Sequence, residues 1–143
     1  MTRFLLGEEP ERVVAQMTSS GMGQGVEDAA MSIWAMPYGA MVMSLESFTH
    51  PFAGSGLEVH GTDGSIFARG VMTQQPVGEI ELLTTAGREV VSFAPHDLYV
   101  QSVGQFVGAV LGRDKPTASG WDGVKSLAVA LAVRESARTG RGL

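Results

Sequence analysis

Residues 26–48 read VEDAAMSIWAMPYGAMVMSLESF, and this stretch predicts an antiparallel β-hairpin. Over residues 26–36, successive side chains point to opposite faces of a strand, and most of them on either face are apolar or small. Pro37-Tyr38-Gly39 is typical of a tight turn, and residues 40–48 return with the same alternation. Both faces of this hairpin are largely apolar, so both need to be covered.

Helices of the same chain can cover one face of such a hairpin, and a second copy of the protein is the simplest cover for the other. The two candidate interface sets are Trp34, Val42 and Ser44 on one face and Met31, Met41 and Met43 on the other. Methionine also fills irregular cores, so packing inside one chain is the alternative explanation of this pattern. The pattern leaves open which set faces outward.

Outward from the hairpin, the sequence predicts more strands and then helices. The further strands are expected at residues 12–18, 57–60, 65–69, 79–84 and 88–93. Helical spacing of apolar residues predicts helices over residues 98–111 and 121–139, and residues 1–6 resemble a helical turn that ends at Gly7. Strands followed by helices indicate an α+β fold: an open, mainly antiparallel β-sheet with the C-terminal helices packed on one face. Residues 1–143 are expected to form a single domain.

Composition excludes several classes of protein. Hydrophobic residues make up 44% and charged residues 17%, which excludes a disordered chain. No basic stripe accompanies the net charge of -5, so no nucleic-acid partner is expected. No apolar run approaches the ~18 residues of a membrane span, and the N-terminus is too short for a signal peptide. The absence of cysteine excludes disulfides and thiolate sites, and the whole pattern indicates a cytoplasmic protein.

No catalytic, cofactor-binding or metal site is visible in the sequence. The glycine-rich residues 21–25 lack the G-x-G-x-x-G spacing and precede a strand, whereas a phosphate-binding loop leads into a helix. The three histidines are too far apart to show metal-ligand spacing. Glu79 and Glu81 share one face of a predicted strand, which we expect to be solvated.

Two stretches resemble the glucose–fructose oxidoreductase and inositol dehydrogenase (Gfo/Idh/MocA) family. Residues 56–66, GLEVHGTDGSI, look like the strand–turn–strand of that family's second domain. The segment from Ala118-Ser119-Gly120 to residues 132–140, AVRESARTG, is similar to its last helix. Residues 71–78, VMTQQPVG, resemble a branch that reduces a sugar derivative.

The resemblance implies a role within a larger enzyme. Family members join a Rossmann domain, which binds NAD or NADP, to an open antiparallel sheet whose free face commonly forms a homodimer. This chain lacks the family's Glu-Lys-Pro and Asp-x-x-x-His motifs, so the resemblance transfers no catalytic residue, and residues 4–7 look like the last turn of the helix that carries the second motif. The chain is therefore interpreted as the C-terminal domain of an NAD(P)-dependent oxidoreductase acting on a sugar or sugar derivative, inactive without its N-terminal Rossmann domain.

In such an enzyme this domain would form one wall of the substrate cleft and the subunit interface. His50, Phe52 and Trp121 are polar or aromatic residues at predicted loops or loop ends, and we expect them to contact substrate. Two alternatives carry no catalysis: a free-standing self-association or scaffold module, and a module that binds a small ligand.

Overall fold

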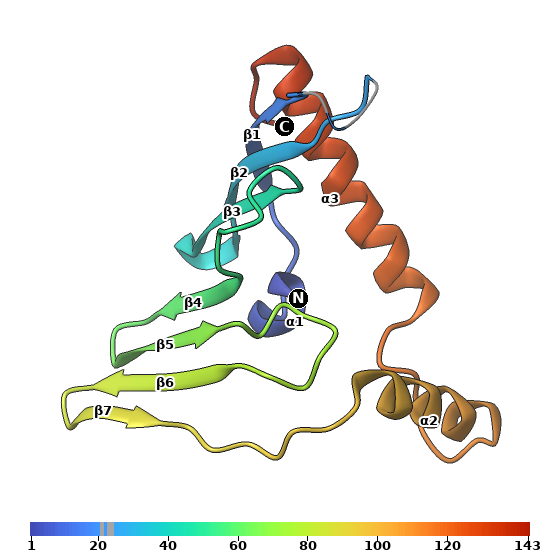
Figure 1. Ribbon diagram of the computed structural model, residues 1–143. Coiled ribbons are helices and arrows are strands. Elements are labelled where there is room, and N and C mark those ends of the chain that lie inside the picture. Colours follow the sequence, from blue (N-terminus) through green and yellow to red (C-terminus); the bar gives the residue numbers. More distant parts are fainter. Residues whose placement is uncertain (21, 23–24) are drawn as a thin grey trace. The chain divides into compact units, whose positions relative to one another are not determined.

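The computed structural model describes residues 1–20, 22 and 25–143, and it confirms the α+β class (Figure 1). In chain order the elements are α1 (Thr2–Leu6), β1 (Arg12–Thr18), β2 (Ala29–Ala35), a 3₁₀ turn (Pro37–Gly39), β3 (Met41–Ser47), β4 (Gly56–His60), β5 (Gly64–Arg69), β6 (Glu79–Thr84), β7 (Gly87–Val90), α2 (Leu98–Val110) and α3 (Gly120–Thr139). Every predicted strand and helix is present, with bounds shifted by a few residues.

The chain forms two compact units, each with its own antiparallel sheet. The first unit comprises Met1–Pro51 and Ala118–Leu143, and its sheet has the order β1-β2-β3. The second unit comprises Phe52–Thr117, and its sheet has the order β4-β5-β6-β7. The strands expected in one open sheet are thus divided between two.

The start of β2 differs from the prediction because Asp28 turns the chain before the strand begins. The Asp28 side chain is buried and accepts hydrogen bonds from the backbone N–H groups of Ser20, at 2.8 Å, and Met22, at 3.2 Å. This carboxylate therefore organises the end of the preceding loop, while the Asp28 backbone still hydrogen-bonds to Thr18 and Phe48. Of the predicted glycine-rich loop, Gly21, Gly23 and Gln24 lie outside the described residues.

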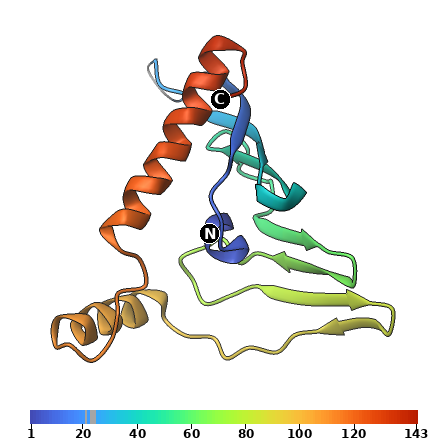
Figure 2. The ribbon, with the colours of Figure 1, turned by 180° about the vertical axis from the view of Figure 1, so that it is seen from behind.

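The core of the first unit lies between α3 and β1. Val13 and Ala15 of β1 pack with Val133 of α3, and Trp34 and Val129 border this cluster. In two opposite views α3 runs alongside the β1-β2-β3 sheet (Figures 1 and 2). One face of this sheet is therefore covered by a helix of the same chain, as expected.

Local signals fix the ends of the helices. Ser119 and Asp122 form a capping box at the start of α3: the Ser119 hydroxyl accepts from the Asp122 N–H, and the Asp122 carboxylate accepts from the Ser119 N–H. Gly140 ends α3 and Gly7 ends α1, both with positive φ, where glycine is favoured. Asp97 caps α2 by accepting from the N–H groups of Tyr99 and Val100.

The α2 helix of the second unit has no buried residue. Its amphipathic spacing is as predicted, but its apolar side chains are exposed in the structure. None of the helices in the described part of the chain combines the length and apolar character needed to cross a membrane.

Candidate functional site

The face of the β1-β2-β3 sheet that points away from α3 is apolar and exposed. Register pairs Val14 with Ile33 and Ile33 with Met43, so these three side chains form one row across the sheet. Met31 and Leu45 are paired in the neighbouring row, and Met41 lies beyond Met43 on the same face. We call Val14, Met31, Ile33, Met41, Met43 and Leu45 the open sheet face; all six side chains are exposed.

The two predicted interface sets therefore lie on opposite faces of this sheet. Trp34, Val42 and Ser44 are half-buried on the face that α3 covers. Met41 and Met43 are 81% and 84% exposed, and Met31 is exposed beside them. A continuous apolar surface of this kind is typical of an interaction site.

The three predicted substrate-contact residues are exposed but lie in different units. His50 and Trp121 belong to the first unit, and Phe52 belongs to the second. His50 Nδ1 lies 2.5 Å from the Ser47 hydroxyl, which fixes the ring against the end of β3. Among the described residues of the first unit, no hydrogen bond or ring contact joins His50 to Trp121.

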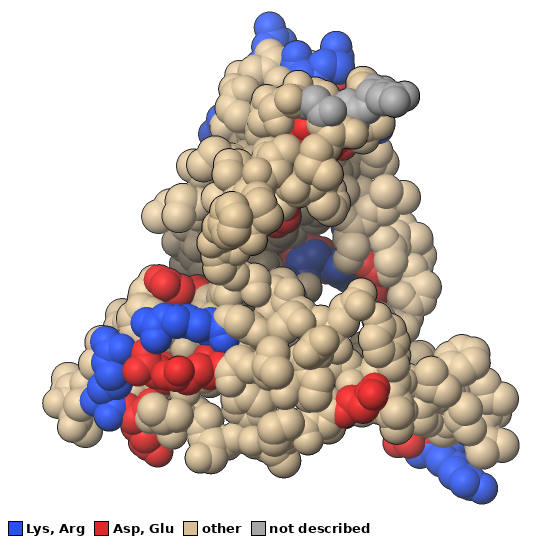
Figure 3. Space-filling view, in the orientation of Figure 1, with Lys and Arg blue, Asp and Glu red and all other residues tan. Residues whose placement is uncertain are grey.

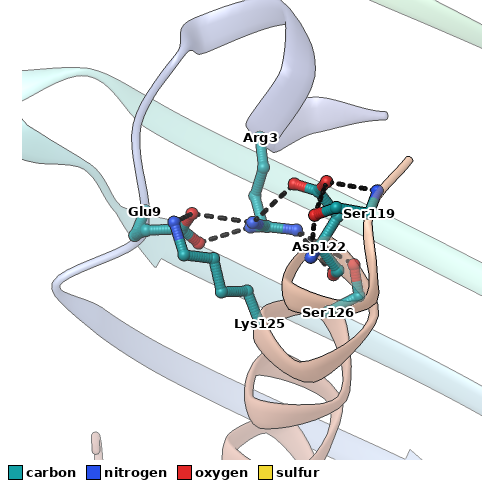
Figure 4. Close-up of polar contacts among 6 residues, drawn as sticks. All are labelled: Arg3, Glu9, Ser119, Asp122, Lys125 and Ser126. Carbon is teal, nitrogen blue, oxygen red and sulfur yellow. Dashed lines mark hydrogen bonds and ion pairs between the residues drawn. The ribbon is translucent and has the colours of Figure 1, made fainter. Parts of the chain in front are cut away.

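A cluster of charged side chains joins α1 to the first turns of α3 (Figure 4). Arg3 holds the Glu9 carboxylate with two guanidinium nitrogens, one of them at 2.7 Å. It also donates to the backbone carbonyl of Asp122, at 3.3 Å, and to the Ser126 hydroxyl, at 3.0 Å. Lys125 reaches Glu9 from α3 at 3.0 Å. One arginine thus links the start of the chain to the start of α3.

The carboxylates of this charge cluster stay ionised and are therefore not suited to proton transfer. Hydrogen bonding from Arg3, with further contributions from Lys125, lowers the pKa of Glu9 to about 2. Hydrogen bonds from the Ser119 hydroxyl and backbone N–H lower the pKa of Asp122. Carboxyl groups that stay ionised at neutral pH are poor proton donors, so the cluster acts as a clamp rather than as an acid–base pair.

Sequence reasoning did not find this clamp. The Ser119-Gly120-Trp121-Asp122 pattern of a capping box was visible in the sequence. The partners of Asp122 were not, because Arg3 is 119 residues away from it. Only the folded chain brings the two together.

A second charged cluster lies on the β4-β7 sheet. Glu81 Oε2 accepts from Arg69 at 2.8 Å and from Arg88 at 2.7 Å, and both guanidinium groups lie over the ring of Phe67. Positive and negative side chains alternate over β5–β7 in Figure 3. The expectation that Glu81 is solvated was wrong: it is 8% exposed, because the two arginines and the neighbouring strands cover it, whereas Glu79 on the same face is exposed.

Neither cluster presents a metal site. Within the described ranges, no group of three or more His, Asp or Glu side chains is placed to hold a metal ion. The two charge clusters consist instead of carboxylates paired with arginine or lysine.

Comparison with known proteins gives a family match for the first part of the chain and a relative along almost all of it. Residues 1–67 match the family described as GFO/IDH/MocA C-terminal domain. The chain is 42% identical over 140 residues to the 1,5-anhydro-D-fructose reductase of Ensifer adhaerens. That alignment covers 97% of this chain and 42% of the relative, so the chain spans less than half of the relative's length.

Solved structures share the fold. Aldose-aldose oxidoreductase from Caulobacter crescentus, solved with glycerol, superposes with a TM-score of 0.89 at 22% identity, over 99% of this chain and 43% of its own. An oxidoreductase from Agrobacterium radiobacter, solved with NAD+, L-tartaric acid and magnesium, gives a TM-score of 0.78 at 21% identity, over 99% of this chain and 45% of its own.

Proposed function

We propose that the chain is the C-terminal domain of an NAD(P)-dependent oxidoreductase of the GFO/IDH/MocA family that acts on a sugar or sugar derivative. The observation that carries the proposal is the 42% identity to a 1,5-anhydro-D-fructose reductase over 97% of this chain. A match along almost all of the chain, in both compact units, supports a shared role for the whole domain rather than for one motif.

The nicotinamide cofactor belongs to another part of the proposed enzyme. The sequence has no G-x-G-x-x-G turn between a strand and a helix, so this chain's residues do not fit a dinucleotide. When bound, the cofactor supplies hydride chemistry. This chain would orient the sugar along one wall of the cleft and would be inactive alone.

His50, Phe52 and Trp121 are the residues that we propose for substrate contact. All three are exposed, and aromatic and imidazole side chains can stack on or hydrogen-bond to a sugar. Replacing each by alanine in the full-length enzyme should raise KM with little change in kcat, since uniform binding is lost. Unchanged KM for all three would remove this assignment.

We also propose that the open sheet face forms a homodimer. Six exposed apolar side chains on one flat sheet face support this role, and α3 covers the opposite face. A free-standing self-association module without catalysis would use the same surface and is the second candidate function.

The decisive experiment compares the full-length reading frame with the 143-residue chain. Full-length protein should oxidise NADH or NADPH in the presence of 1,5-anhydro-D-fructose, and the chain alone should not. No turnover of this or other keto sugars by the full-length protein would contradict the oxidoreductase proposal and favour the self-association module.

A further inference from the structure

An open hollow lies at one end of the β4-β5 hairpin in the second unit (Figure 1). It is lined by residues 54–58, which lead into β4, and by residues 68–70, at the end of β5. The backbone N–H of Gly70 donates to the Ser55 carbonyl at 2.7 Å and ties the two sides together. The volume of the hollow, about 450 Å³, falls within the ~300–1,000 Å³ range of sites for small molecules.

Three glycines keep this hollow free of side chains: Gly54, Gly56 and Gly70. A Cβ atom at Gly56 would lie 2.6 Å from the Ala68 carbonyl oxygen, so only glycine allows this close approach of the two strands. A Cβ atom at Gly54 would meet no atom of the described residues within 4 Å, and its φ is not in the left-handed region. Space is therefore available at Gly54 for atoms of a ligand.

The charged side chains that line the hollow balance each other. Glu58 contributes a carboxylate and Arg69 a guanidinium, and their side chains are 61% and 60% exposed. Glu58 lies 3.3 Å from His60 Nε2, and Arg69 contacts Glu81 through one nitrogen, Nη1, at 2.8 Å. One acceptor and one donor of opposite charge favour a neutral ligand whose groups both donate and accept hydrogen bonds, as hydroxyl groups do.

An exposed aromatic residue precedes the hollow. Phe52 lies two residues before Gly54, in the same unit, and its side chain is fully exposed. An aromatic ring can pack against the C–H groups of a sugar ring and leave the hydroxyl groups to polar partners. An aromatic ring, a carboxylate and a guanidinium together match the chemistry of a neutral sugar.

We propose that this hollow binds a neutral sugar or polyol. Glu58 accepts hydrogen bonds from its hydroxyl groups, Arg69 donates to them, and Phe52 packs against the ring. The choice of a sugar among neutral ligands rests on the proposed function. The residues that form the site all belong to the second unit, so the 143-residue chain should bind the sugar by itself.

The test titrates the 143-residue chain with 1,5-anhydro-D-fructose and follows the backbone amide signals by NMR. Tetrahydropyran, the same ether ring without hydroxyl or carbonyl groups, is the comparison ligand. The sugar should shift the signals of residues 54–58 and 68–70 saturably, and tetrahydropyran should leave them unchanged. No saturable shift with the sugar, or equal shifts with both compounds, would overturn the inference.

The first test variant is Gly54→Leu, which fills the hollow and should raise the dissociation constant for the sugar at least tenfold. Its matched control is Gly104→Leu, because a Cβ atom at Gly104 of α2 likewise meets no described atom within 4 Å. Glu58→Ala removes the carboxylate without adding bulk and should also weaken binding, with Glu89→Ala on β7 as its control. Unchanged binding in both test variants, or equal weakening in test and control variants, would remove the site.

Failure of this site and failure of the proposed function give different results, because the titration needs neither cofactor nor turnover. Absence of sugar binding to the 143-residue chain, together with turnover by the full-length protein, removes only the site. Sugar binding at the hollow without turnover by the full-length protein removes only the proposed function.

Discussion

Glu9 is the residue whose ionisation ties the start of the chain to α3. Its pKa is lowered to about 2, chiefly by the hydrogen bonds from Arg3, so its ion pairs persist when the pH falls below the usual range of a glutamate. A lowered pKa in the folded state contributes stability that is complete above the unfolded value of about 4.3 and is lost as the pH falls towards 2. Stability should therefore drop as the pH is lowered through this window.

Replacement of Glu9 by glutamine should weaken that pH dependence. The variant should have a lower Tm than the unmodified chain at about pH 6, and the difference should shrink towards about pH 2, since protonation then breaks the same ion pairs. Thermal unfolding followed by circular dichroism at several pH values measures this. Glu8→Gln is the control, because Glu8 makes no ion pair among the described residues. A constant difference between the Glu9 variant and the unmodified chain at every pH would contradict the role of Glu9.

Ser136 is fully buried and satisfies two backbone groups. Its hydroxyl accepts from the Ala15 N–H at 3.0 Å and donates to the Arg141 carbonyl at 2.6 Å. Ser136→Ala should lower the free energy of unfolding by about 1–3 kcal/mol, because a buried N–H loses its partner. Urea unfolding measures the loss, and Ser102→Ala on the exposed surface of α2 is the control. Equal stability of the two variants would contradict the stabilising role of the Ser136 hydroxyl.

Among the helices, α3 depends on its capping box. Ser119→Ala should cost about 1 kcal/mol, because the Asp122 N–H loses its acceptor. The same change should raise the pKa of Asp122 from its lowered value, since the Ser119 hydroxyl is the main cause of that lowering. Urea unfolding measures the first effect and NMR titration the second. Ser119→Asn retains a capping side chain and should keep most of the stability.

The β4-β7 sheet should depend on Glu81 more than on Glu79. Glu81→Gln removes the charge that both Arg69 and Arg88 contact, and it leaves two guanidinium groups facing a neutral amide. We expect a loss of about 1.5–3 kcal/mol in the free energy of unfolding, the range for hydrogen bonds to charged groups. Urea unfolding measures this loss, and Glu79→Gln is the matched control on the same strand face. A larger effect at Glu79 would contradict the role assigned to Glu81.

For strands and helices, the periodicity of the sequence predicted the elements well. It did not predict contacts between residues that are far apart in the sequence. Residues 79–84 alternate cleanly and form β6 with the predicted bounds. The burial of Glu81 was missed because alternation assigns a face but cannot show that Arg69 and Arg88 cover a carboxylate there. The pattern of residues 26–48 likewise predicted a hairpin with two apolar faces, but only the packing of α3 on β1 shows which face stays open.

For the whole molecule, the open sheet face predicts self-association. The 143-residue chain should run in light scattering as a dimer of about twice 15.1 kDa, in equilibrium with monomer on dilution. Met43→Lys places a charge in the middle row of this face, beside Ile33. Because burying an unpaired ammonium group is costly, the dissociation constant should rise at least tenfold, which corresponds to about 1.4 kcal/mol.

Met72→Lys is the matched control, since Met72 is also exposed but lies in the loop before β6, away from the open sheet face. A general effect of added charge would weaken association equally in both variants, and the interface would then lie elsewhere. If the unmodified chain is monomeric, the proposal of a dimer through this face is wrong. Loss of association in the Met43→Lys variant alone would assign the interface to the methionine set rather than to Trp34, Val42 and Ser44. That second set lies on the opposite face, which α3 covers.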